Sequence, residues 1–320
     1  MSRNVVVTGI GAVTPLGLGV EAFWDGLCAG RSAIVKREYT ADKFSLTLPV
    51  APADDLEAPI KDLGRPLFRA DRFSQLAVLA ADEAVKQSGL DFDDTLGAHT
   101  ASIIGTGIGG QSTFDDGYVA MLRQERRPHP LTILKVMPNA AASHVSIRYG
   151  LRGPSFAVSS ACATGAHAIG VCAELIKSGT ADAGVAGASE AVLTYGALEA
   201  WKAMHILADE NCRPFSKNRN GLVIGEGAGV LVLEEEEHAK KRGAEILCRV
   251  SGFGMNADGK DMINPDVNGA AGAMQLALKD LEITAAKNVY INAHGTGTLL
   301  NDPAETKAIR SVFGADAADL

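Results

Sequence analysis

The stretch VSSACATGAHAIG, Val158–Gly170, places a single cysteine among serine, alanine, threonine and glycine. The apolar run before it, SFAVSS (155–160), is typical of a strand, and the Ala/Gly-rich segment 164–177 predicts a helix. Cys162 is therefore predicted to lie at a tight strand-to-helix turn, where a helix N-terminus lowers the pKa of a thiol and backbone N–H groups can stabilise an oxyanion. A lone cysteine is more often a small buried residue. The small neighbours nevertheless favour an approachable nucleophile.

Strands and helices alternate on both sides of this turn. Apolar residues at helical spacing from Phe73 to Val85 predict a helix, with Asp71 as N-cap and Gly89 as C-cap. Other patterns predict strands at 4–9, 100–105, 229–235, 246–254 and 288–292, and helices at 20–29, 139–150, 235–242, 268–281 and 302–313. This order is typical of an α/β chain with mainly buried strands.

Two segments have compositions that need a separate interpretation. Residues 38–66 contain proline, are polar and show poor periodicity, so we expect an irregular excursion from the core. The charge run within 235–242 pairs Glu236 with Lys240 and Glu237 with Lys241 at helical spacing. That spacing predicts a solvated helix with paired charges.

Composition narrows the class of protein. A chain of 320 residues with 47% hydrophobic residues can bury a core as one or two domains. It has no secretory signal, and it has no apolar run long enough to span a membrane. We therefore expect a soluble, cytoplasmic protein. The five scattered cysteines argue against disulfides and a zinc site, and the net charge of −8 argues against a nucleic-acid partner. With 35 glycines and 5% aromatics, we expect the tightest packing around SSACATG and IGEGAG.

His294 is the histidine that we expect to serve a reaction. It follows the predicted strand 288–292 in the segment NAHGTGTLLND (292–302), among small and hydroxyl-bearing residues. An imidazole at such a strand end can donate a hydrogen bond to a carbonyl or a developing enolate oxygen. The other histidines are expected to be inert, and His167, close to Cys162 in sequence, is expected to have a structural role.

A rival motif is GTGIGG, Gly105–Gly110, which fits G-x-G-x-x-G after a strand. Glu125 follows Gly105 at about the spacing of a dinucleotide fingerprint, which makes an NAD-dependent oxidoreductase the competing hypothesis. Glycine is abundant in this chain, however, and the acidic residues of STFDDG come where a pyrophosphate would be bound.

Taken together, these motifs resemble the β-ketoacyl-[acyl-carrier-protein] synthases of the thiolase superfamily, the type II elongating synthases most of all. The resemblance rests on VVVTGIGAVTPLG, DRFSQLA, GTGIGG, GPSFAVSSACATGAHAIG, CRPFSKNRNGLVIGEGAGVLVLEE and NAHGTGTLLNDPAETKAI. It implies a thiolase-like five-layered αβαβα fold of two similar halves, with the second half incomplete. The corresponding domains are 1–245, which carries Cys162, and 246–320, which carries His294.

The resemblance also implies site residues and partners. Cys162 is the acyl-accepting nucleophile, His294 is one of two histidines in decarboxylation and condensation, Thr296 and Thr298 line the phosphopantetheine channel, and Ile108 faces the acyl pocket. No cofactor or metal is implied, and neither nucleic acid nor membrane is an expected partner. The expected partners are an acidic acyl carrier protein and a second copy in a homodimer. Candidate residues for docking the carrier protein are Arg65, Arg69, Arg126, Arg127 and Lys202.

The chain departs from this family's pattern in its C-terminal part. A lysine in an STK-like segment, a second histidine and a late glycine-rich loop do not occur before Leu320, so we expect a fragment of a longer synthase. The alternatives are a non-catalytic partner subunit of the chain-length-factor type and an inactive fragment. Between Met204 and Arg213 the chain is short, and Trp201 precedes it, which resembles the nodulation-protein branch of the family.

Overall fold

The computed structural model of the chain describes residues 3–279, 281 and 289–318. It divides into two compact units, the first formed by Met1–Ala200 and Ile224–Val250 and the second by Trp201–Val223 and Ser251–Leu320. The described ranges contain no helix that combines the length and the apolar character of a membrane span.

The first unit contains all the named strands. They are β1 (Val5–Thr14), β2 (Gly17–Leu18), β3 (Val35–Ala41), β4 (Phe44–Ala51), β5 (Thr100–Gly105), β6 (Ser155–Phe156), β7 (Ala183–Glu190), β8 (Ile224–Gly225), β9 (Gly227–Glu235) and β10 (Cys248–Arg249). Its helices are α1 (Val20–Cys28), α2 (Glu57–Asp62), α3 (Arg65–Phe68), α4 (Arg72–Ser88), α5 (Asp94–Ala98), α6 (Gln111–Arg123), α7 (Thr132–Val136), α8 (Ala140–Tyr149), the 3-10 turn η1 (Ala161–Ala163), α9 (Thr164–Lys177) and α11 (Glu236–Lys241). Helix α10 (Tyr195–Ala203) runs across the division between the units.

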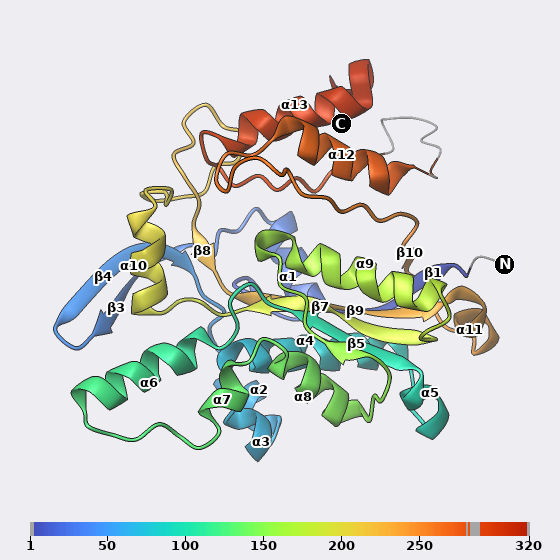
Figure 1. Cartoon of the computed structure of the whole chain (residues 1–320), viewed down its shortest axis with the longest axis horizontal. Coiled ribbons are helices and arrows are strands. Elements are labelled where there is room, and N and C mark those ends of the chain that lie inside the picture. Colours follow the sequence, from blue (N-terminus) through green and yellow to red (C-terminus); the bar gives the residue numbers. More distant parts are fainter. Residues whose placement is uncertain (1–2, 280, 282–288, 319–320) are drawn as a thin grey trace. The chain divides into compact units, whose positions relative to one another are not determined.

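A mixed seven-stranded sheet forms the centre of this unit, in the order β10-β1-β9-β7-β5-β6, with β2 paired to β1. Strand β9 is antiparallel to both β1 and β7, whereas β5 is parallel to β7. Helices α4 and α8 cover one face of the sheet and α9 covers the other (Figure 1). Strands β1, β5 and β7 are almost entirely buried, which confirms the prediction of an α/β chain with buried strands.

Helix α4 has both predicted caps. The Asp71 carboxylate accepts from the Phe73 N–H, and Gly89 adopts a left-handed conformation with φ 61°. Helix α4 and β1 approach each other closely, because a Cβ on Gly11 would lie 1.8 Å from the carbonyl oxygen of Ala80. That the tightest packing surrounds SSACATG and IGEGAG stays a prediction.

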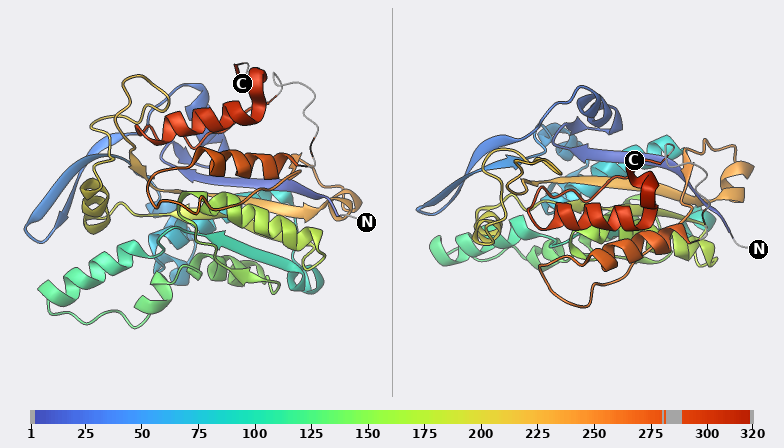
Figure 2. Two further views of the ribbon diagram at one scale, coloured as in Figure 1. Left: turned by 45° about the horizontal axis from the view of Figure 1, so that its top comes forward. Right: turned by 90° about the horizontal axis from the view of Figure 1, so that it is seen from above.

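The predicted irregular excursion at 38–66 is also wrong. Strands β3 and β4 form an antiparallel hairpin that β8 extends, and α2 and α3 follow it. Asp42 makes the tight turn with φ 55°, a conformation for which turns favour glycine and asparagine, and the turn residues 41–44 include neither. Both views of Figure 2 show the hairpin and α6 extending from the same end of the sheet.

Several strands are shorter than predicted. Pairing covers only Ser155–Phe156 of 155–160 and Cys248–Arg249 of 246–254. Residues 289–292 of the predicted strand 288–292 have no regular structure, and Asn288 lies outside the described residues. A strand exists only where a neighbour supplies ladder hydrogen bonds, and in the described ranges none runs beside 289–292.

The charge run forms α11 as predicted, and Lys240 pairs with Glu236 at 3.2 Å. The interpretation of a purely solvated helix is wrong, because the Glu236 residue is only 3% exposed. Its carboxylate accepts from the side chains of Asn4 and Arg249, which tie α11 to the N-terminal end of β1 and to β10.

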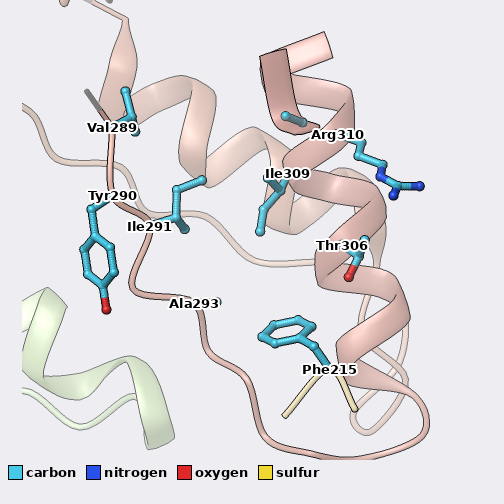
Figure 3. A pocket seen from close by; sticks show the side chains of 9 residues that line it. Phe215, Val289, Tyr290, Ile291, Ala293, Thr306, Ile309 and Arg310 are labelled. Atoms are coloured by element: carbon cyan, nitrogen blue, oxygen red, sulfur yellow. The ribbon is translucent and has the colours of Figure 1, made fainter. Parts of the chain in front are cut away.

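The regular structure of the second unit, in the residues described, is helical. It contains α12 (Val267–Leu278), α13 (Asn301–Phe313) and the 3-10 turn η3 (Gly314–Ala318), and α12 packs against α13. Segment 289–293 runs beside α13, and an apolar cavity of about 380 Å³ opens between them. Figure 3 shows the side chains of Ile291, Ile309 and Phe215 around this cavity.

Candidate active site

The turn that carries Cys162 has a left-handed residue at its centre. Ala161 has φ 50°, a conformation that costs an L-residue about 1–2 kcal/mol. The turn is held by the Ser160 N–H, which donates to Thr164 Oγ1 at 2.8 Å, and by the Ala163 N–H, which donates to the Ser160 carbonyl at 3.2 Å. Strain at one residue is thus compensated by hydrogen bonds on both sides of it.

Cys162 itself is exposed and comes two residues before the first residue of α9, as predicted. The preceding strand ends at Phe156, earlier than expected, so four irregular residues separate β6 from η1. Cys172, the other cysteine of this segment, is fully buried in α9, and burial raises the pKa of its thiol to about 12. Of these two thiols only Cys162 is accessible.

His167 contacts this same turn. Its Nδ1 lies 2.7 Å from Ser160 Oγ, so the imidazole and the hydroxyl share a hydrogen bond. The bond joins the first half of α9 to the residue just before η1. This contact agrees with the structural role expected for His167.

The glycine-rich loop after β5 lies against the Cys162 turn. The Thr106 N–H donates to the Val158 carbonyl at 3.3 Å, and Ser159 Oγ donates to the Gly107 carbonyl at 3.3 Å. Ile108 follows Gly107 directly and is 45% exposed. The structure therefore brings the loop of Ile108 and the turn of Cys162 together within one unit.

Glu190, at the end of β7, holds this loop and was missed by the sequence analysis. Its carboxylate accepts from Thr106 Oγ1 at 3.0 Å and from the Gly107 N–H at 2.7 Å. Burial raises the pKa of this carboxyl group, and the hydrogen bonds oppose that rise. The available signal was an acidic residue at the end of a small, buried strand, GVAGASE.

The same contacts argue against the dinucleotide interpretation of GTGIGG. In a dinucleotide-binding loop the amides face a pyrophosphate, whereas here the amide of Gly107 faces a carboxylate. Glu125 lies in irregular chain beyond the end of α6, not at the end of a second strand.

Close packing explains the glycines of this motif instead. A Cβ on Gly105 would lie 2.3 Å from Thr164 Cγ2, and a Cβ on Gly110 would lie 2.5 Å from the Cα of Val136. The motif therefore lets the loop fit between α7 and the start of α9.

In the second unit, His294 begins a loop with two left-handed glycines. Gly295 has φ 51° and Gly297 has φ 73°. A Cβ on Gly297 would lie 2.7 Å from the Gly221 carbonyl oxygen, and that oxygen belongs to a backbone that cannot rotate away. His294 is exposed, and Thr296 Oγ1 lies 2.9 Å from Thr298 Oγ1. The structure thus gathers His294, Thr296 and Thr298 on one short loop.

Two carboxylates of α13, for which no role was predicted from the sequence, shape this loop. Glu305 accepts from the His294 N–H at 2.6 Å and from the Gly295 N–H at 2.9 Å. Asp302, which is 2% exposed, accepts from the Gly297 N–H at 3.1 Å. Their spacing of three residues puts both on one face of the helix, and this was the signal in NDPAE.

Across the described ranges, no three side chains of histidine, cysteine, aspartate or glutamate lie close enough together to hold a metal ion. The acidic groups of both loops are engaged with backbone N–H groups of their own unit. The chemistry available at these loops is that of a thiol, an imidazole and oriented backbone amides.

Comparison with protein families identifies the chain. A family model described as "Beta-ketoacyl synthase, N-terminal domain" matches residues 2–239, and one described as "Beta-ketoacyl synthase, C-terminal domain" matches residues 247–320. The chain belongs to the β-ketoacyl synthase family. The resemblance predicted from the motifs is therefore confirmed.

Similar proteins indicate which branch of the family this synthase resembles. It is 44% identical to Nodulation protein E of Rhizobium leguminosarum bv. trifolii, covering 100% of this chain and 80% of that protein. It is 38% identical to 3-oxoacyl-[acyl-carrier-protein] synthase 2 of Vibrio cholerae, covering 98% of this chain and 78% of that protein. The predicted resemblance to the nodulation branch is confirmed, and the synthase spans about four fifths of the length of both relatives.

A solved structure confirms the fold class. The synthase matches a type II polyketide-synthase ketosynthase, solved in complex with its acyl-carrier protein, with a TM-score of 0.83 and 29% identity. The match covers 99% of this chain and 79% of that chain. The fold is the thiolase-like ketosynthase fold.

Proposed function

We propose that the chain is a β-ketoacyl-[acyl-carrier-protein] synthase that extends acyl chains in fatty-acid or polyketide synthesis. The observation that carries the proposal is the exposed thiol of Cys162, presented at the left-handed turn before α9. A cysteine thiolate is a strong nucleophile, and a substrate can approach it when the side chain is exposed. Its family membership and its curated synthase relatives support the same reaction.

The proposed chemistry has two half-reactions. The Cys162 thiolate attacks the carbonyl carbon of an acyl thioester, an acyl–cysteine bond forms, and the thiol of the phosphopantetheine arm leaves. A malonyl thioester then loses CO2, and the electron pair of the broken bond forms an enolate. The enolate carbon attacks the acyl-cysteine carbonyl, which releases the thiolate and yields a β-ketoacyl thioester. No bound cofactor takes part.

We assign the other residues to roles in this reaction. His294 donates a hydrogen bond to the enolate oxygen, Thr296 and Thr298 line the channel for the phosphopantetheine arm, and Ile108 borders the acyl pocket. Support comes from the exposure of His294 and Ile108 and from the shared loop of His294 and both threonines. The proposed domains are 1–245 and 246–320, a division that the family matches at 2–239 and 247–320 support.

Changing Cys162 to serine tests the proposal. The wild-type protein, incubated with a long-chain acyl-[acyl-carrier protein], should gain one acyl group by intact mass, and peptide mapping should locate it on Cys162. Cys162→Ser should lower the rate of acylation by at least about 100-fold, because a hydroxyl is a far weaker nucleophile than a thiolate.

Cys248→Ser is the matched control, because Cys248 is an exposed thiol in β10. It should acylate like the wild type. An adduct on Cys248 in place of Cys162 would contradict the assignment. A wild-type protein that gains no acyl group would instead favour a non-catalytic partner subunit.

We propose that an acyl carrier protein delivers the substrate and docks near Arg126 and Arg127. Both arginines are exposed, and with His129 and Lys135 they line a cavity of about 720 Å³ between the β3–β4 turn and α6. The solved ketosynthase complex supports such a partner. The candidates Arg65, Arg69 and Lys202 are also exposed, but they do not line this cavity.

Reversing both charges tests this dock. Arg126→Glu with Arg127→Glu should raise the carrier-protein concentration needed for half-maximal acylation roughly tenfold at low salt, and the effect should shrink as salt screens it. Acylation by a small pantetheine thioester should not change. Arg31→Glu, at another exposed arginine of the unit, is the control. An unchanged carrier-protein concentration for half-maximal acylation would refute this docking site.

We further propose a homodimer in the cytoplasm. Strand β6 is an exposed sheet edge, and exposed apolar side chains on and near α7 and α8, including Ile133, Leu134 and Ile147, support a partner surface there. A nucleophilic thiol works only when reduced, which favours the cytoplasm. A sedimentation measurement that gave the mass of one chain would refute the dimer.

A further inference from the structure

The carboxylate of Glu190 stands at the end of β7 and accepts from two hydrogen-bond donors. They are Thr106 Oγ1 at 3.0 Å and the backbone N–H group of Gly107 at 2.7 Å. Both belong to the loop that carries Ile108. An ionised carboxylate accepts through two oxygens and donates nothing, so it suits such a site.

Thr106 extends this network across the loop. Its hydroxyl donates to Glu190 and accepts from the Gly109 N–H at 3.0 Å, and Gly109 has φ 88°. Thr106 is 1% exposed, so water cannot easily take the place of either bond. The carboxylate therefore determines the backbone on both sides of Ile108.

Gly107 lies between this carboxylate and the turn of Cys162. A Cβ there would lie 2.7 Å from Glu190 Oε2 and 3.9 Å from the Cα of Ala161. In the chain, Ile108 follows Gly107 directly and Cys162 follows Ala161 directly. A change in the bond between Glu190 and Gly107 must therefore move Ile108 relative to the thiol.

We propose that Glu190 is a positioning residue that fixes Ile108 against the turn of Cys162 and thereby sets which chain lengths the thiol accepts. The inference deepens the proposed function, on which it rests. Glu190→Gln would replace one of the two acceptor oxygens with an NH2 group, so either the Thr106 hydroxyl or the Gly107 N–H would lose its acceptor. The loop would then relax while the Cys162 turn keeps its own hydrogen bonds.

The test measures how fast Cys162 is alkylated by iodoacetamide and by its N-dodecyl derivative. In both reactions the thiolate sulfur bonds to the CH2 carbon and iodide leaves, so neither a thioester nor a carrier protein is needed. Glu190→Gln should change the ratio of the long-chain to the short-chain rate by roughly fivefold or more, and Ile108→Ala should change it in the same direction. The double variant should change this ratio little more than either single variant does, because both substitutions act through the side chain at position 108.

Glu174→Gln makes the same chemical change at an exposed position of α9 and should leave the ratio within about twofold of wild type. If Glu190→Gln does not fold, Thr106→Val, which removes only the bridging hydroxyl, should give the shift. A folded Glu190→Gln protein with the wild-type ratio would overturn the proposal, and so would an Ile108→Ala protein with that ratio. Missing acyl transfer in the wild type would refute the proposed function without affecting this ratio.

Discussion

Gly11→Ala is expected to lower the free energy of unfolding by more than about 4 kcal/mol, which is a large part of the stability of an ordinary domain. The added Cβ would lie 1.8 Å from the Ala80 carbonyl oxygen and 2.9 Å from the Ala84 nitrogen, both in the backbone of α4. No rotamer change can relieve a backbone contact, so α4 would have to move away from β1. That move would open the core on this face of the sheet, where Leu76, Ala77 and Ala80 are fully buried.

Urea unfolding followed by circular dichroism measures this loss, with pulse proteolysis if little folded protein is recovered. Gly229→Ala is the matched control, because Gly229 lies in β9 opposite Ala12 of β1 and a Cβ there would meet nothing within 4 Å. The control should stay within about 0.5 kcal/mol of wild type. Equal losses in the two variants would mean that close approach to α4 is not the reason for glycine at position 11.

The helices could be predicted from sequence because their determinants are local. Asp71 and Gly89 cap α4 within its own sequence, and helix α9 has the predicted bounds, Thr164–Lys177. The hairpin of β3 and β4 could not be predicted, because the neighbouring sequence does not indicate that its turn residue Asp42 is left-handed. The lengths of β6 and β10 likewise depend on partner strands that are distant in sequence.

The site shows the same division between local and distant determinants. Cys162 and Ile108 lie in short motifs, so local sequence indicated both. Glu190 and Glu305 act by accepting backbone N–H groups that lie 83 and 11 residues away. Which amides a carboxylate meets is decided by packing, and a sequence pattern alone does not reveal it.

Arg242→Met is expected to lower the free energy of unfolding by about 3–5 kcal/mol. The side chain of Glu234 is fully buried, and Arg242 donates to its two oxygens at 2.6 and 2.8 Å. Arg242 also donates to the Ser88 carbonyl at 2.7 Å. The variant would leave a buried carboxylate held only by Thr8 and His238. Lys177→Met breaks an exposed pair with Glu174 and should cost no more than about 1 kcal/mol.

The pH dependence separates lost charge pairing from lost packing. Burial acts to raise the pKa of Glu234, but hydrogen bonds from Arg242 and Thr8 outweigh it and hold the pKa below the ordinary value of 4.5. In the wild type, the stability contributed by Glu234 is therefore complete above that value and is lost as the pH falls through the folded-state pKa. Without Arg242, burial should dominate and raise the pKa, so the variant should gain stability as the pH falls from 7 to about 5.

The double variant Glu234→Gln with Arg242→Met removes the carboxylate and should show no such gain. The double variant should be more stable at pH 7 than Arg242→Met alone, since an uncharged amide costs less to bury than an uncompensated carboxylate. Equal stability of the two at pH 7, with parallel pH profiles, would show that the arginine contributes packing and not charge pairing.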